Sequence, residues 1–112
     1  MSQSIRAEFL RDGRLRLLVS FGEVPCGFVT DGASVPCAVR CIFGHPYDRR
    51  HIRAGVRHDW RYAVGGDEKL RRAADRQYMN DLKQDGLGLV ARLVEYCFVR
   101  LFGRSHFNYV EV

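Results

Sequence analysis

The amino-acid sequence predicts an α+β fold in which a small antiparallel sheet packs with about four helices. Stretches near both ends of the chain alternate apolar and polar residues, as strands do. The segments between them place apolar residues three or four positions apart, as helices do. A length of 112 residues with 46% apolar residues fits a single domain, residues 1–112, with its own hydrophobic core.

An N-terminal hairpin and a C-terminal strand are expected to form the sheet. Residues 5–10 and 15–20 both alternate, and Asp12-Gly13 between them favours a tight turn because these residue types readily adopt a positive φ. Residues 27–30 predict a third short strand. Residues 107–112 alternate again, and we expect them to form a last strand that closes the N-terminal sheet.

The first two helices are expected in the middle of the chain. A short helix over residues 35–43 is predicted because Ser34 is a good N-cap and Pro36 suits an early helical position. A second helix over residues 51–64 is followed by Gly65-Gly66, which ends it.

The third and fourth helices fill most of the remaining sequence. Asp67 is expected to cap the third helix, which runs to about Gln84 and is ended by Asp85-Gly86. The fourth helix has the clearest pattern, with Arg92 and Arg100 off its apolar face. The residues of that face are Leu87, Val90, Leu93, Val94, Cys97, Phe98 and Leu101.

The charge pattern indicates a soluble protein with a basic surface. The net charge is +5, and the basic residues are nearly all arginines, which are scattered along the chain. The absence of a dense basic tract disfavours specific binding to nucleic acid. No apolar run approaches the ~20 residues of a membrane span, and the N-terminus has no hydrophobic signal core, so a cytoplasmic location is expected.

The dipeptide His58-Asp59, followed by Tyr62, is the strongest candidate for chemistry. On a helix His58 and Tyr62 share a face, while Asp59 points about 100° away. A neutral histidine can take a proton from water or bind a metal. An adjacent aspartate can bind a hard cation such as calcium, or a transition metal.

Two further aspartates are expected to join this site. Asp31 lies where a strand meets a helix, and Asp75 lies on the next, antiparallel helix, from which it could orient the ring of His58. Arg71, four residues before Asp75, could pair with it at the surface or hold it in place inside. The alternative is a buried polar network that joins two helices and a loop without any chemistry.

The cysteines suggest a second, less favoured metal site. Cys37, Cys41 and His45 follow one another at intervals of four, with Cys26 upstream, and could present a zinc-binding face. The spacing is not that of a zinc finger, and cysteine is a common core residue. In the cytoplasm all four cysteines, including Cys97, are expected to be reduced thiols, and the sequence leaves open whether they do more than pack.

These motifs together resemble the DUF1353 family of small, uncharacterised proteins that are common in phages and prophages. The resemblance covers most of residues 23–103 and implies a phage or prophage origin, but no activity. It rests on the segments Gly27 to Pro36, His58-Asp59 with Tyr62, Ala74-Asp75 with Tyr78, and Val99 to Gly103.

A second resemblance is local to the helix with His58. The pattern His58-Asp59-x-x-Tyr62 is similar to the active-site helix of secreted phospholipases A2, in which the histidine activates water and the aspartate binds calcium. An aspartate on an antiparallel helix orients that histidine, and Asp75 is the matching residue here. The disulfide framework and the glycine-rich calcium loop of those enzymes have no counterpart, so the resemblance concerns the logic of the site.

Two hypotheses about function follow from the sequence. The first is a metal-assisted hydrolase of an ester or amide bond in the cell envelope, with catalytic His58, Asp75 and Tyr62 and with calcium or zinc held by Asp31 and Asp59. The second is a non-enzymatic phage protein, either a virion or tail component or an inhibitor of a host protein. In that case the same residues form a structural network, and the basic surface meets an acidic phage or host partner. The protein would act in the cytoplasm of the infected host or in the virion.

Overall fold

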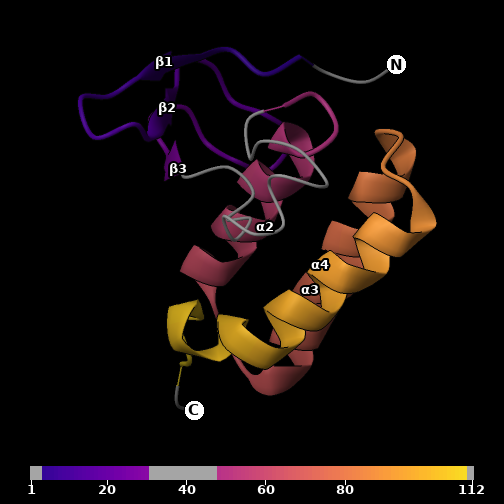
Figure 1. Ribbon diagram of the computed structural model, residues 1–112. Helices are drawn as coiled ribbons and strands as arrows, with labels where there is room; N and C mark the ends of the chain where they lie inside the picture. Colours follow the sequence, from indigo (N-terminus) through magenta and orange to yellow (C-terminus); the bar gives the residue numbers. More distant parts are fainter. Residues whose placement is uncertain (1–3, 31–47, 111–112) are drawn as a thin grey trace.

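The computed structural model describes residues 4–30 and 48–110, and within them it confirms the α+β class (Figure 1). The described residues form three short strands and three α-helices, followed by one turn of 3₁₀ helix. The helix expected over residues 35–43 lies outside them. The elements are β1 (Ala7–Phe9), β2 (Leu15–Leu17), β3 (Val29–Thr30), α2 (Ile52–Val64), α3 (Glu68–Gln84), α4 (Leu89–Phe102) and η1 (Gly103–His106).

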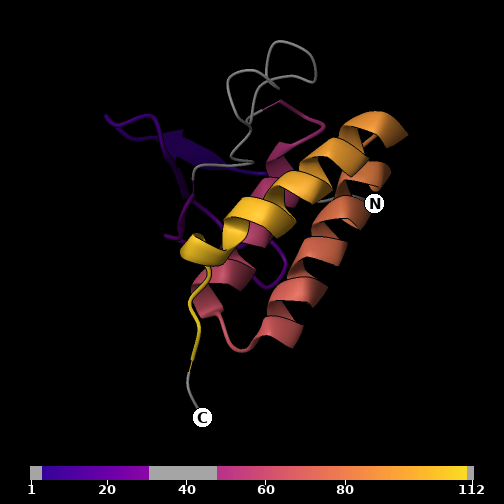
Figure 2. The same cartoon turned by 60° about the horizontal axis from the view of Figure 1, so that its bottom comes forward.

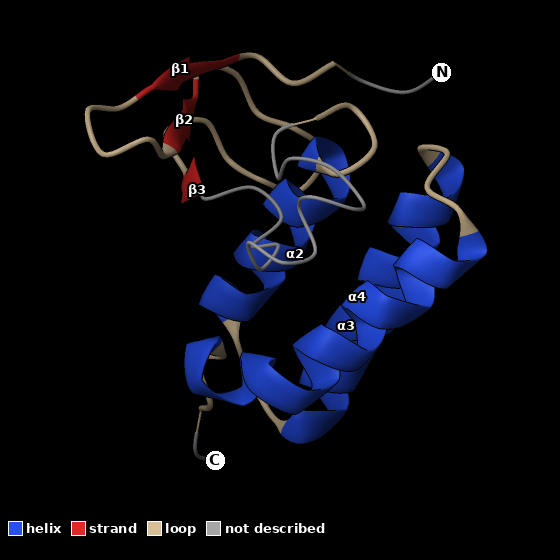
Figure 3. Cartoon of the chain, in the orientation of Figure 1, coloured by secondary structure: helices blue, strands red, loops and turns tan. Residues whose placement is uncertain are grey.

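The sheet is antiparallel in the order β1-β2-β3, and its strands are shorter than the alternating sequence suggests. The predicted hairpin is confirmed: Phe9 pairs with Leu15 across a turn in which Gly13 has a φ of 88°. Leu15 and Leu17 are buried, while Arg16 between them is exposed, as expected for a sheet with one covered face. Figure 3 shows the strands gathered on one side of the molecule, next to α2.

The prediction that the C-terminal segment closes this sheet is wrong for the residues described. The backbone of Gly66, in the loop between α2 and α3, instead donates to Asn108 O and accepts from Val110 N, each at 3.0 Å. Tyr109 and Gly66 form a single parallel bridge. The segment can approach because Gly65 has no Cβ, which would lie 1.8 Å from the carbonyl oxygen of Asn108.

The three helices form the main core. Figures 1 and 2 show α3 and α4 side by side, with α2 between them and the sheet. Asp67 caps α3 as predicted, since its carboxylate accepts from Leu70 N at 2.9 Å. One cluster, which includes Leu82 and Ala91, fills the space between helices, and a second, which includes Val56, joins α2 to the sheet. No helix in the described ranges combines the length and apolar character needed to cross a membrane.

The orientation of α4 differs from that of an ordinary amphipathic helix. Most of its apolar residues point outward, with exposed fractions of 69% for Val90, 46% for Leu93 and 74% for Leu101. The residues of α4 that are buried are Ala91 and Glu95. The helix therefore presents a carboxylate to the core and its apolar face to the surface.

A buried histidine explains why α4 turns this way. His51, at the N-cap of α2, is fully buried, and its Nε2 lies 2.8 Å from Glu95 Oε2 while its Nδ1 lies 2.7 Å from Asp48 Oδ1. Tyr78 donates to the other oxygen of Glu95 at 2.9 Å. A ring with a carboxylate at each nitrogen is stabilised as the imidazolium. Burial alone would lower the pKa of His51, but the hydrogen bonds to Glu95 and Asp48 outweigh it and raise the pKa.

This arrangement makes stability depend on pH in a defined direction. The folded-state pKa of His51 lies above the unfolded value of about 6.5, so its stabilising contribution is complete below that pH and is lost as pH rises through the folded-state pKa. We expect the free energy of unfolding to fall by at most about 1.4 kcal/mol per pH unit in that interval. Urea unfolding at a series of pH values measures the slope.

The control for this slope is His51→Gln, which keeps an N–H donor without a titratable group. The variant should be less stable below pH ~6.5 and should lose the part of the slope that His51 contributes. Identical slopes in the two proteins would contradict the assignment of a buried imidazolium.

Gly65 and Gly86 provide a matched test of the C-terminal contact. Both have a positive φ, of 75° and 93°, but a Cβ at Gly86 meets nothing within 4 Å, whereas one at Gly65 collides with Asn108. Gly86→Ala should cost about 1–2 kcal/mol from backbone strain alone. Gly65→Ala should cost more, roughly 3 kcal/mol or above, because it also displaces the C-terminal segment. Equal losses in urea unfolding would mean that this segment contributes little to stability.

Candidate functional site

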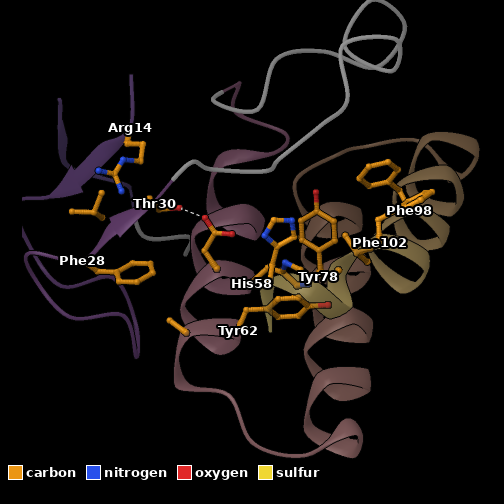
Figure 4. A pocket seen from close by; sticks show the side chains of 14 residues that line it. Arg14, Phe28, Thr30, His58, Tyr62, Tyr78, Phe98 and Phe102 are labelled. Carbon is orange, nitrogen blue, oxygen red and sulfur yellow. Dashed lines mark hydrogen bonds between the residues drawn. The ribbon is translucent and has the colours of Figure 1, made fainter. Parts of the chain in front are cut away.

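A cavity of about 410 Å³ opens between β3, α2 and the C-terminal end of α4. Its polar side chains include His58, Asp59 and Thr30, and its apolar wall includes Phe28, Phe98 and Phe102. Figure 4 shows Arg14 on the sheet side of the cavity, with Phe98 and Phe102 on the opposite side. Arg14 and His106 line the cavity although the sequence analysis did not single them out.

The structure brings three of the predicted site residues together. His58 and Tyr62 lie one turn apart on the same face of α2 (Figure 4), and Asp75 contacts both of them from α3. One oxygen of Asp75, Oδ1, lies 2.7 Å from His58 Nε2 and accepts a hydrogen bond from the Tyr62 hydroxyl at 2.6 Å.

The second oxygen of Asp75 is held by arginines. Arg100 donates from Nη1 to Asp75 Oδ2 at 2.7 Å, and Arg71 Nη1 lies 3.7 Å from the same oxygen. Asp75 is fully buried, which by itself would raise its pKa. The hydrogen bonds from His58, Tyr62 and Arg100 outweigh burial and lower the pKa, so that the group stays a carboxylate.

This carboxylate determines which nitrogen of His58 carries the proton. An ionised carboxylate only accepts hydrogen bonds, so Nε2 must be the N–H donor toward Asp75. In the neutral form of this ring the lone pair is on Nδ1, which accepts no hydrogen bond from the residues described. The arrangement is that of a histidine base with its tautomer set by a buried aspartate.

Two aromatic rings hold the plane of His58. The ring centroids of Tyr62 and Tyr78 lie 4.2 and 4.7 Å from that of the histidine. The side chain of His58 is 10% exposed, and it contributes to the wall of the cavity. Burial and the contact with Asp75 raise the pKa of Tyr62, which therefore stays a hydroxyl donor at neutral pH.

A second layer of charges supports Asp75 from behind. Glu68 accepts from Arg71, from Arg100 at 2.8 Å and from the Tyr109 hydroxyl at 2.5 Å. These contacts, with that of Arg71 first, lower the pKa of Glu68. Arg71 is buried, so it takes the inward of the two positions considered from the sequence. The role of Arg100 was missed, because the sequence analysis noted only that it lies off the apolar face of the fourth helix.

Asp59 points toward the sheet, away from Asp75. Its Oδ2 accepts from the hydroxyl of Thr30 at 2.5 Å, which ties α2 to the end of β3. Asp31, the next residue along the chain, lies outside the described residues. Within residues 4–30 and 48–110, no three His, Cys, Asp or Glu side chains gather closely enough to hold a metal ion. The metal site at Asp31 and Asp59 stays a prediction.

The zinc site considered from the sequence cannot be assembled from the described residues. Cys37, Cys41 and His45 lie outside them. Cys26 and Cys97 are free thiols, and both are exposed.

Comparison with known proteins finds a match to one protein family. The family model described as "Protein of unknown function (DUF1353)" matches residues 15–99. His58, Tyr62 and Asp75 lie within the matched region, whereas Arg14 and Arg100 lie just outside it. Neither the curated proteins nor the solved structures contain a match.

Removal of the charge on Asp75 tests how far the packing depends on this network. Asp75→Asn keeps the size of the side chain but leaves Arg100 without its buried counter-charge. We expect the free energy of unfolding to fall by about 3 kcal/mol, the usual cost of breaking a buried ion pair. Asp12→Asn removes an exposed partner of Arg14 and should change little. Similar unfolding curves for the two variants would contradict a structural role of Asp75.

Proposed function

Because the chain belongs to the DUF1353 family, which is described only as proteins of unknown function, we propose a function from the site itself. The protein is a small hydrolase of an ester or amide bond, in which His58 acts as the base and Asp75 orients it. The observation that carries this proposal is the contact of His58 Nε2 with a fully buried carboxylate, which leaves the lone pair on Nδ1 of a ring that lines the cavity.

The proposed step follows from the protonation states. Nδ1 of His58 removes a proton from a water molecule, and the resulting hydroxide attacks the carbonyl carbon of the substrate. Asp75 stabilises the imidazolium that forms, and the same proton then passes to the leaving oxygen or nitrogen. Tyr62 keeps Asp75 Oδ1 in place through its hydroxyl.

The walls of the cavity favour a substrate with an apolar part. Phe98, Phe102 and Val99 give one side of the cavity an apolar surface, while Arg14, which is paired with Asp12, gives the opposite side a polar one. An ester or amide of the cell envelope, in a lipid or in peptidoglycan, fits a protein of phage or prophage origin. Figure 4 shows His58 between these two sides, where a bond joining a polar to an apolar group would lie.

A divalent cation, calcium or zinc, is the second part of the proposal. Asp59 lines the cavity and is a carboxylate of the kind that binds hard cations, so it fits as one ligand. Asp31, which follows Thr30 directly, is the proposed second ligand. Bound there, the cation would supply positive charge for the oxyanion that develops on the carbonyl oxygen.

A second candidate function is supported by the completeness of the network. Both oxygens of Asp75 accept hydrogen bonds, and Glu68 accepts from both Arg71 and Arg100 behind it. Buried charges need such hydrogen-bond partners even when the network has only a structural role. In this reading the chain is a non-enzymatic phage protein, a virion or tail component or an inhibitor, whose basic surface binds an acidic phage or host protein in the host cytoplasm.

His58→Gln separates these two functions. The glutamine amide can still donate to Asp75 but has no basic nitrogen. With a panel of acyl esters of increasing chain length, phospholipids and peptidoglycan fragments, we expect the variant to lose at least about 100-fold in kcat/KM, the usual contribution of a general base. Its melting temperature should change little.

The matched control is His106→Gln, which also alters a histidine of the cavity wall but leaves Asp75 untouched. It should keep its activity to within a few-fold. No turnover by the wild-type protein on any of these substrates, together with a large loss of stability in His58→Gln, would favour the structural function.

The cation is tested separately by thermal melting. After treatment with a chelator, calcium, zinc, manganese and magnesium are added back one at a time. A cation that binds only the folded protein raises its stability by RT ln(1 + [L]/Kd), about 2.7 kcal/mol at 100 times Kd. We expect one cation to raise the melting temperature, and this rise to disappear in Asp59→Asn. If no cation shifts the melting curve, the proposed metal site is absent.

A further inference from the structure

The outward face of α4 is an unbroken apolar surface. We name it the α4 stripe, and its residues are Leu89, Val90, Leu93, Val94, Cys97 and Leu101, all exposed. Figure 2 shows α4 lying in front of α2 and α3, so that one side of it faces outward. Arg100 borders the stripe, but its guanidinium turns inward to Asp75 and Glu68.

The rotation of α4 cannot relax to bury this stripe. Turning the helix would remove Glu95 from His51 and Tyr78, and Arg100 from Asp75 and Glu68. Each of these changes leaves a buried charge without its partner. The free-energy cost of an unpaired buried charge is far larger than that of exposing a few aliphatic side chains. The apolar surface is therefore a permanent feature of the folded protein.

We infer that the α4 stripe is a homodimer interface, on which a second copy of this chain packs its own α4. Within the stripe Val90, Val94, Cys97 and Leu101 are spaced four, three and four residues apart. This is the a/d spacing of a coiled-coil seam, in which the apolar edge of one helix fits against that of another. A two-fold axis would place the same residues on both sides, so the surface is complementary to itself.

The size of the stripe agrees with this partner. Its six side chains expose on the order of 500 Å², at the upper end of apolar patches on monomers and often functional. A standard interface buries about 800 Å² per partner. The stripe thus supplies most of such an area.

The charges around α4 favour a second copy over a lipid surface. A helix that lies on a membrane carries exposed lysines and arginines on its polar side. Here the arginines of that side point into the protein: Arg92 is half-buried with Nε fully enclosed, and Arg100 is ion-paired. Because neither arginine of α4 is exposed, an apolar partner suits this face, and the same stripe on a second copy provides one.

This inference does not depend on the proposed hydrolase, and solution mass tests it. Sedimentation velocity or light scattering between roughly 1 and 100 μM, the range of weak to moderate dimers, should give twice the mass of one chain at the upper end. The variant Val90→Glu/Leu101→Glu should remain a monomer throughout, with at least a 100-fold weaker association. Its circular dichroism should stay close to that of the wild type, because both side chains are exposed. Its melting curve should match that of the wild type at concentrations where the wild type is a monomer.

Two controls keep the result interpretable. Leu18→Glu changes an apolar side chain that is 52% exposed but lies after β2, and it should still dimerise. If the glutamate variant fails to fold, Val90→Gln/Leu101→Gln makes the same test without added charge. A wild-type protein that is monomeric at 100 μM, or stripe variants that still dimerise, would overturn the proposal. A monomer that co-sediments with anionic lipid vesicles would likewise overturn it and assign the stripe to a membrane.

Discussion

Two buried carboxylates determine how the three helices pack. Asp75 on α3 binds His58 and Tyr62 from α2 and Arg100 from α4. Glu95 on α4 binds His51 at the start of α2 and Tyr78 from α3. Each carboxylate thus draws a partner from both of the other helices. Because an unpaired buried charge is very costly, the helices have little freedom to rotate or slide.

The two networks touch each other through aromatic rings. The ring of Tyr78, which belongs to the Glu95 network, packs against the ring of His58, which belongs to the Asp75 network. We therefore expect a substitution at one carboxylate to alter the packing around the other. The candidate site is held firmly, because His58 bonds to Asp75 and its ring packs against two tyrosine rings.

The need to pair these two buried carboxylates also accounts for the cavity next to His58 and for the exposed α4 stripe. Asp75 orients the ring of His58, which lines the cavity, and orientation of Glu95 toward His51 leaves the apolar side of α4 outside. In both cases a buried polar contact determines which side chains are exposed at the surface. A structural network and a reactive site are therefore compatible here, and turnover decides whether the cavity is used for chemistry.

Local patterns in the sequence determined the elements and part of the site. Asp12-Gly13 specified the hairpin, Asp67 specified the start of α3, and helical spacing placed His58 and Tyr62 on one face. Antiparallel neighbours then brought Asp75 within reach. These features follow from nearest-neighbour chemistry, which depends on residues a few positions apart.

Only the tertiary structure decided what each face meets. The periodicity of the sequence identified the apolar side of α4 but did not show whether this side faces the core or the solvent. It faces the solvent, because the contacts of Glu95 with His51 and Tyr78 outweigh the burial of aliphatic side chains. The C-terminal segment likewise follows Gly66 rather than the sheet, because backbone access at Gly65 and Gly66 depends on the loop between two helices. The position of Arg100 and the cavity wall opposite Arg14 also arise from long-range packing, which no local pattern encodes.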